Sequence, residues 1–229
     1  MFSFKLFLEQ SSNQLLGQVQ KYAKKAGFEC RDLGGHILLI KNKIKGPHVL
    51  VSGTFHGDEP SGSMAIVEVL KTNPDWLNKI NVSFLPIVNP TGFSANTRND
   101  KWGGNPNRGF IHDKNKLSKE GKVLKDNVSK MMPLDGFLTL HEDDRYDGFY
   151  FYTYKDTPLV KAMIKTGKKF FKEHNKGVTH AQGHDGSFED YLHHQGVETI
   201  CVEVPGKADL KEKVKCQVGL IECFVSQYV

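Results

Sequence analysis

Two segments of the chain end in side chains that could bind a metal. The apolar segment "HVLVSGT" (48–54) is followed by a turn that carries His56 and Glu59, and the segment "GFLTLH" (136–141) ends at His141. Two imidazoles and one carboxylate form a common catalytic zinc set, which leaves a fourth position for water or substrate. A lone HxxE spacing also occurs where a histidine only packs or caps. The second histidine, also at the end of an apolar run, favours one zinc ion.

Glu203 lies near the end of a further apolar run, "VETICVEV" (197–204). A buried strand rarely holds an ionised carboxylate that has neither a partner nor a function. One interpretation is a salt bridge to a lysine. We favour a general base that takes a proton from water beside the metal and passes it to a leaving amine. The reason is that Pro205 and Gly206 place Glu203 at the open end of its strand.

The longest irregular segment, 89–116, is rich in glycine, asparagine and proline. A loop of this length is usually functional or disordered, and its aromatic residues argue against disorder. It carries Arg98, Asn107 and Arg108. Arginine binds carboxylates through its forked donors and can stabilise an oxyanion, although exposed loop charges are also common. We therefore interpret the segment as a binding loop.

The elements around these residues indicate an α/β fold. Strands are predicted at 36–41, 48–54, 80–89, 136–141, 148–154 and 197–204, and helices near 12–26, 61–72, 118–131, 158–174 and 209–226. Ser118 is a candidate N-cap of the helix at 118–131. Strands that are apolar on both faces and alternate with helices favour a mostly parallel sheet covered by helices on both faces. No repeat, linker or low-complexity tract divides the chain. We therefore expect residues 1–229 to form a single domain.

The composition limits the partners. The formal net charge is +5, and part of it lies in lysine-rich runs that are typical of solvated helix faces. No finger, RNP-type or helix-turn-helix pattern is present, so we expect no nucleic-acid partner. A mildly positive field could instead attract a small anionic substrate. No apolar run approaches the ~20 residues that span a bilayer, so we expect no membrane partner either.

The termini and the cysteines favour the cytoplasm. The N-terminal stretch "MFSFKLFLEQSSNQ" lacks the long apolar core and cleavage site of a secretory signal, so we interpret it as the start of the folded domain. The four cysteines are scattered without a CxxC pair. They suit a reducing compartment and should act as small apolar filler.

The ordered motifs resemble those of the carboxypeptidase A-like zinc metallopeptidases. The motifs are "HGDEPSG", "NPTGF", "TRND", "NPNRGF", "LHED" and "ETICVEVPG", and together they span about 50–206. The resemblance implies a mixed, twisted, eight-stranded sheet flanked by helices. It also implies a role for each candidate: zinc ligands His56, Glu59 and His141; catalytic base Glu203; substrate-carboxylate binding by Asn107 and Arg108; and polarisation of the scissile carbonyl by Arg98.

Two features depart from that family. The chain has "NPNR" at 105–108 where the family often has "DLNR", and no tyrosine of "GFYFYTY" (148–154) matches the family's substrate-capping tyrosine securely. The short chain resembles compact bacterial members that trim peptidoglycan peptides. It also resembles related amidohydrolases that remove acyl groups from amino acids.

The resulting hypothesis is a zinc-dependent metallocarboxypeptidase that hydrolyses an amide bond next to a free carboxylate. Its substrate would be a small peptide, with a cell-wall (murein) peptide as one candidate, or an acylated amino acid. The first alternative is an aspartoacylase-like or succinylglutamate desuccinylase-like amidohydrolase. The second is a catalytically inactive module that binds zinc or a ligand. The "NPTGF" and "LHED" segments favour the peptidase.

Overall fold

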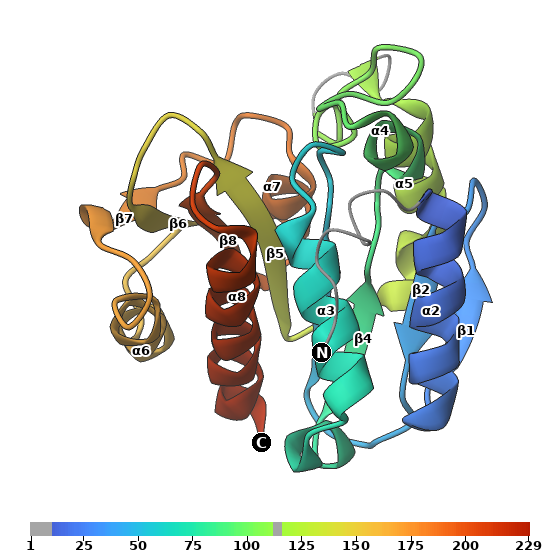
Figure 1. Ribbon diagram of the computed structural model, residues 1–229, viewed down its shortest axis with the longest axis horizontal. Coiled ribbons are helices and arrows are strands. Elements are labelled where there is room, and N and C mark those ends of the chain that lie inside the picture. Colours follow the sequence, from blue (N-terminus) through green and yellow to red (C-terminus); the bar gives the residue numbers. More distant parts are fainter. Residues whose placement is uncertain (1–10, 112–115) are drawn as a thin grey trace.

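The structure is a computed structural model that describes residues 11–111 and 116–229. The N-terminal stretch 1–10, interpreted above as the start of the domain, lies outside the described residues, and so does 112–115. Within the described ranges, one eight-stranded sheet has the order β1-β2-β4-β3-β5-β8-β6-β7 (Figure 1). Its strands are β1 (Glu29–Asp32), β2 (Leu38–Lys41), β3 (His48–Gly53), β4 (Asn81–Leu85), β5 (Gly136–Asp143), β6 (Phe149–Thr153), β7 (Glu173–His180) and β8 (Glu198–Pro205).

Helices connect most of these strands. They are α2 (Ser12–Lys25), α3 (Ser61–Thr72), α4 (Pro90–Ala95), α5 (Lys119–Met131), α6 (Pro158–Gly167), α7 (Phe188–His193) and α8 (Leu210–Val225), with short 3₁₀ turns at Asp75–Asn78 and Ser226–Tyr228. Side chains cap several of them at the N-terminus. Ser118 accepts a hydrogen bond from the backbone N–H of Gly121, as the sequence predicts, and Asp209 accepts two at the start of α8.

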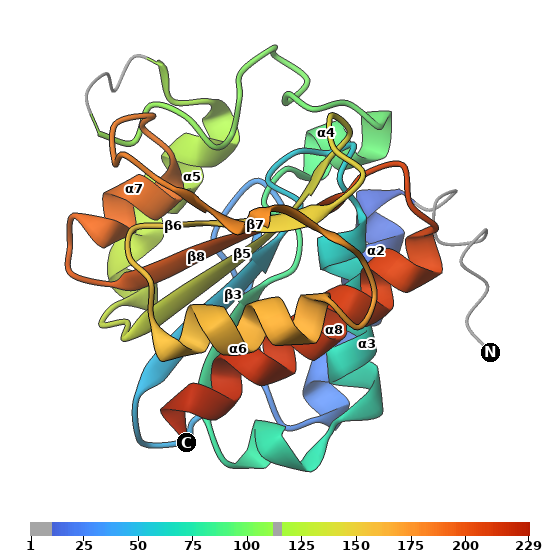
Figure 2. The same cartoon turned by 90° about the vertical axis from the view of Figure 1, so that its left-hand side faces the viewer.

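Helices cover both faces of the sheet (Figure 2). One hydrophobic cluster joins the sheet to α2, α3, α6 and α8, and a second joins the opposite face to α5 and α7. The central strands β3 and β5 are buried along their whole length. A strand buried on both faces is mostly apolar, and β3 and the first part of β5 show this pattern. The last three residues of β5, His141, Glu142 and Asp143, are buried polar residues. The predicted α/β class is therefore confirmed.

The pairing of the strands determines where the polar residues meet. Strands β4, β3, β5 and β8 are parallel neighbours, whereas β6 is antiparallel to β8, and β1 and β2 form an antiparallel edge. The sheet is therefore mixed and mostly parallel. In the β5–β8 pairing, His141 lies directly opposite Glu203. The carboxyl ends of adjacent parallel strands are where open α/β sheets bind ligands.

Some predicted elements differ from the observed ones. The helix predicted at 158–174 ends at Gly167, and the chain then enters the strand β7. A side chain at Gly167 would collide with the ring of Phe149, since a Cβ there would lie 2.6 Å from a ring carbon. Strand β1 was not predicted because its sequence, "ECRD", is polar and mostly exposed at the sheet edge. The segment 89–116 contains the short helix α4.

Two further features concern the cysteines and the membrane. All four cysteines are free, and each is buried or half-buried, in agreement with the predicted role as apolar filler. Across residues 11–111 and 116–229, none of the helices combines the length and the apolar character required to cross a bilayer.

Candidate metal and active site

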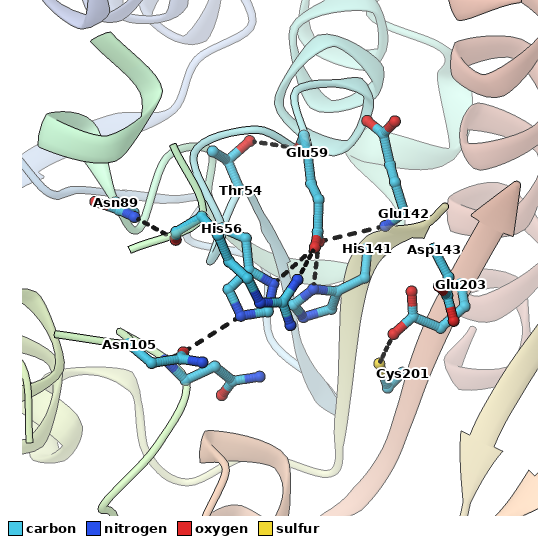
Figure 3. Close-up of polar contacts among 12 residues, drawn as sticks. Thr54, His56, Glu59, Asn89, Asn105, His141, Glu142, Asp143, Cys201 and Glu203 are labelled. Atoms are coloured by element: carbon cyan, nitrogen blue, oxygen red, sulfur yellow. Dashed lines mark hydrogen bonds and ion pairs between the residues drawn. The ribbon is translucent and has the colours of Figure 1, made fainter. Parts of the chain in front are cut away.

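The turn after β3 carries the first two candidate ligands. Thr54 adopts a left-handed backbone conformation (φ +47°), and its hydroxyl donates to the carbonyl oxygen of Glu59 at 3.2 Å. The backbone N–H of Glu59 donates to the carbonyl oxygen of His56 at 3.1 Å. These bonds close the turn and direct both side chains to the same side (Figure 3). Asp58, in the same turn, is exposed.

Gly57 is essential to this turn for a steric reason. A Cβ at Gly57 would lie 1.9 Å from the carbonyl carbon of Gly92, which is a backbone atom and cannot rotate away. We expect Gly57→Ala to lower the free energy of unfolding by about 1–3 kcal/mol or more and to weaken zinc binding. Denaturant unfolding and zinc titration measure the two effects. Gly17→Ala is the control, because no atom lies within 4 Å of the added Cβ and alanine favours the helix.

The carboxylate of Glu59 lies between the other two candidate ligands and contacts both of them. Its Oε1 lies 2.8 Å from Nδ1 of His56, and its Oε2 lies 2.7 Å from Nδ1 of His141. All three residues are at most 5% exposed. Burial opposes the charge of Glu59, but the two imidazoles outweigh it and lower its pKa. Burial likewise opposes the protonation of His141, but the carboxylates around it raise its pKa well above the usual value.

The donor set fits a divalent metal. One ligand atom from each of His56, Glu59 and His141 lies within 4.8 Å of the others. Two imidazole nitrogens and a carboxylate oxygen are typical zinc ligands. The ring of His56 is oriented by Asn105, whose Oδ1 lies 3.3 Å from Nε2 and can accept its proton. Asn105 is the first residue of the "NPNR" segment, so the departure from "DLNR" places an amide next to a candidate ligand.

Glu203 lies beside this cluster on the neighbouring strand β8 (Figure 3). The hydrogen-bonding neighbour of its carboxylate is the thiol of Cys201, with 3.9 Å between Sγ and Oε1. Burial raises the pKa of Glu203 to about 8, although His141 lowers it. The salt bridge to lysine that we weighed as an alternative is not formed with any lysine of the described ranges. Glu203 is thus a half-buried carboxylate beside the three candidate ligands, and no lysine of the described residues balances its charge.

The binding loop supplies the remaining candidates. A guanidinium nitrogen of Arg98 lies 2.9 Å from Oε1 of Glu59. The guanidinium of Arg108 is 41% exposed and lies 3.2 Å from a carboxylate oxygen of Asp185. Asn107 is buried, and its Oδ1 accepts the backbone N–H of Phe188 at 2.9 Å. Asn107 therefore attaches the loop to α7, and the donors of Arg108 remain partly accessible.

A cavity of about 540 Å³ brings these groups together. Six of the seven predicted residues line it: His56, Arg98, Asn107, Arg108, His141 and Glu203. The wall also contains Arg145, Tyr152, Tyr154, His180, His184, Asp185, Glu189 and Cys201. A volume of this size lies within the range of about 300–1,000 Å³ that is common for ligand sites.

Several of these wall residues were not identified from the sequence. Glu189 lies on the short helix α7, outside all of the motifs. The three tyrosines of the segment 148–154 differ in their contacts and in their position relative to the cavity. The hydroxyl of Tyr150 donates to Asp143 at 2.6 Å, and that of Tyr154 donates to Asp190. Tyr152 and Tyr154 line the cavity, whereas Tyr150 does not.

Glu142 and Asp143, the two residues that follow His141, are both buried. Glu142 accepts the backbone N–H of Ser61 at 2.7 Å and pairs with Lys213. Asp143 accepts hydrogen bonds from Arg145 and Tyr150. Both carboxylates therefore hold neighbouring segments of the chain together at the end of β5, next to the site.

The topology of the sheet and the cluster of candidate ligands are those of the zinc carboxypeptidase-like hydrolases. The profile of the succinylglutamate desuccinylase/aspartoacylase catalytic domain matches residues 45–217, which is most of the chain. The chain therefore belongs to that family, and it is a metal-dependent hydrolase of this superfamily. A comparison with curated protein sequences finds no significant match.

Solved structures agree with this assignment. A provisionally named metallopeptidase of Shewanella denitrificans is 28% identical, with a TM-score of 0.86, and the alignment covers 94% of this chain and 90% of that one. A metallo-carboxypeptidase of Burkholderia cenocepacia (18% identity, TM-score 0.72, coverage 93% and 67%) shares the fold. So does a succinylglutamate desuccinylase of Silicibacter sp. TM1040 (17% identity, TM-score 0.61, coverage 83% and 60%).

Proposed function

We propose that residues 1–229 form one catalytic domain, a zinc-dependent metallocarboxypeptidase that hydrolyses an amide bond next to a free carboxylate. The observation that carries the proposal is the convergence of His56, Glu59 and His141 at one cavity, beside Glu203. A small peptide fits the size of the cavity, and a cell-wall peptide remains one candidate. The similarity to the Shewanella metallopeptidase supports the peptidase form.

Each residue has a defined part in the proposed reaction. His56, Glu59 and His141 would hold one zinc ion, which supplies Lewis-acid chemistry by lowering the pKa of water and polarising a carbonyl group. Glu203 takes the proton from the attacking water and gives it to the leaving amine. Arg98 lies close enough to Glu59 to place a positive charge where the oxyanion develops. Arg108, with Asn107, binds the substrate carboxylate.

The second candidate is an N-acyl amino acid amidohydrolase, which the family match favours. Both reactions need a free carboxylate next to the scissile amide, and they differ in what lies on the other side of that bond. Turnover of a panel of small peptides should be compared with turnover of N-acetyl and N-succinyl amino acids. We expect faster turnover of the peptides. Preference for the acyl amino acids would establish the amidohydrolase, and turnover of neither class would favour a binding module.

Removal of Arg108 tests carboxylate recognition. Hydrogen bonds to a charged group contribute about 1.5–3 kcal/mol, so Arg108→Ala should lower kcat/KM roughly tenfold to a hundredfold, mainly through KM. The loss should be absent for a substrate whose terminal carboxylate is amidated, because that substrate lacks the charge. Arg31→Ala on the exposed edge strand β1 is the control. An equal loss for both substrates would show that Arg108 does not bind the carboxylate.

A further inference from the structure

The second nitrogen of His141 faces a carboxylate that the proposed reaction does not use. Nδ1 of His141 points to Glu59, and the opposite ring nitrogen, Nε2, lies 3.6 Å from Oε1 of Glu189. Nε2 is buried and has no hydrogen-bond partner within the described residues. The matching nitrogen of His56 differs in this respect, because Asn105 is within hydrogen-bonding distance of it.

The carboxylate of Glu189 has few hydrogen-bond donors around it. It lies in the first turn of α7, which packs against β5 and β8 (Figure 2), and its side chain is 7% exposed. Oε1 accepts one long hydrogen bond of 3.4 Å from Asn107, and Oε2 is buried with no partner in the described ranges. A buried carboxylate without good donors is costly, so a folded protein should supply one.

Two groups near Glu189 could supply the proton. The ligand atoms of His141, Glu189 and Cys201 lie within 4.8 Å of one another. The thiol of Cys201 is a weak donor, and its hydrogen bond runs to Glu203. The ring N–H of His141 is the stronger donor and is otherwise unpaired. The geometry therefore favours a contact between His141 and Glu189.

We propose that Glu189 is a positioning residue, whose carboxylate accepts the Nε2 proton of His141 and so keeps Nδ1 as the metal-binding atom. This inference rests on the proposed function, since it takes His141 as a metal ligand. Metal-binding histidines commonly donate their other N–H to a carboxylate, and this contact fixes the tautomer and the ring orientation.

The same carboxylate connects the metal cluster to the binding loop. Asn107 donates to Glu189 and accepts the backbone N–H of Phe188, and Arg108 is the next residue of the loop. Glu189 is therefore in contact with Asn107, one of the two residues proposed to bind the substrate carboxylate. Its removal should weaken metal binding and also raise KM.

The experiment measures zinc affinity by competition with a chelator, in the absence of substrate. Glu189→Met removes the acceptor at similar volume and should weaken zinc binding by about 10–100-fold. Glu189→Gln retains an acceptor oxygen and should lose less. Glu120→Gln is the matched control, because Glu120 is equally buried but accepts from Thr91, at 2.6 Å, and faces no candidate ligand. Its zinc affinity should equal that of the wild type.

A second measurement uses only the wild-type protein and so does not depend on the folding of a variant. In ¹⁵N NMR of the zinc-loaded protein, His141 should carry its proton on Nε2. A proton on Nδ1, or a zinc affinity of folded Glu189→Met within about twofold of the wild type, would overturn the inference while leaving the zinc site intact. If the wild type binds no zinc at His141, the proposed function fails and the inference fails with it.

Discussion

Glu203→Gln should lower kcat by about 10²–10⁴-fold while zinc binding stays at the wild-type level. Glutamine has nearly the same shape as glutamate but cannot take a proton from water at neutral pH. Glu203 is not one of the three residues that form the metal cluster, so the metal should remain bound. Steady-state kinetics, together with metal analysis of the same sample, measure both quantities.

The control and the pH profile sharpen this test. Glu198→Gln lies on the same strand β8, where Glu198 accepts from Tyr228 at 3.0 Å, and it should leave kcat unchanged. Burial raises the pKa of Glu203, so the acid form predominates at low pH and activity should rise with pH as the proton is lost. This rise should disappear in Glu203→Gln. Unchanged turnover of that variant would remove Glu203 from the mechanism.

Lys213→Met should lower the free energy of unfolding by about 3–5 kcal/mol. Lys213 on α8 pairs with Glu142 at the end of β5, and both side chains are at most 8% exposed. The ammonium also donates to the carbonyl oxygen of Gly206 at 2.6 Å. Without Lys213, Glu142 keeps a buried charge with the backbone N–H of Ser61 as its main partner. Denaturant unfolding at neutral pH measures the loss.

The sign of the pH dependence provides an internal check. Burial already raises the pKa of Glu142 in the native protein, despite Lys213, and removal of the ammonium should raise it further. A carboxyl group whose pKa is raised by folding destabilises the protein above that pKa, and protonation relieves the cost as the pH falls. The stability difference between Lys213→Met and the wild type should therefore shrink at acidic pH.

A surface pair serves as the control for this prediction. Lys215 contacts Glu212 at 2.6 Å on the exposed side of the same helix, and Lys215→Met should change stability by no more than about 1 kcal/mol. Equal losses for the two lysine variants would show that burial of the Lys213–Glu142 pair has no special importance for the fold.

The sequence predicted the parts of the fold that depend on buried strands and capped helices. The apolar runs at 48–54 and 136–141 correspond to β3 and β5, and the Ser118 cap marks the start of α5. The pattern of apolar residues could not locate β1, because an exposed edge strand needs few apolar residues. It also extended α6 too far, since lysines and phenylalanines after Gly167 are compatible with a helix.

In the candidate site, too, some residues could be predicted from the sequence and others could not. The motif residues His56, Glu59 and His141 were identifiable because each lies in or just after an apolar run whose end they mark. Glu189 was not, because it reaches the site from a six-residue helix and its contact with His141 depends on how α7 packs. The contact of Asn105 with His56 likewise depends on the route of the loop, which spacing alone does not specify.

An anomalous-scattering map of zinc-loaded crystals, recorded at the zinc absorption edge, tests the central claim most directly. We predict one strong peak about 2 Å from Nδ1 of His56, Nδ1 of His141 and a carboxylate oxygen of Glu59. A map whose zinc peak lies away from any of these three side chains would contradict the account.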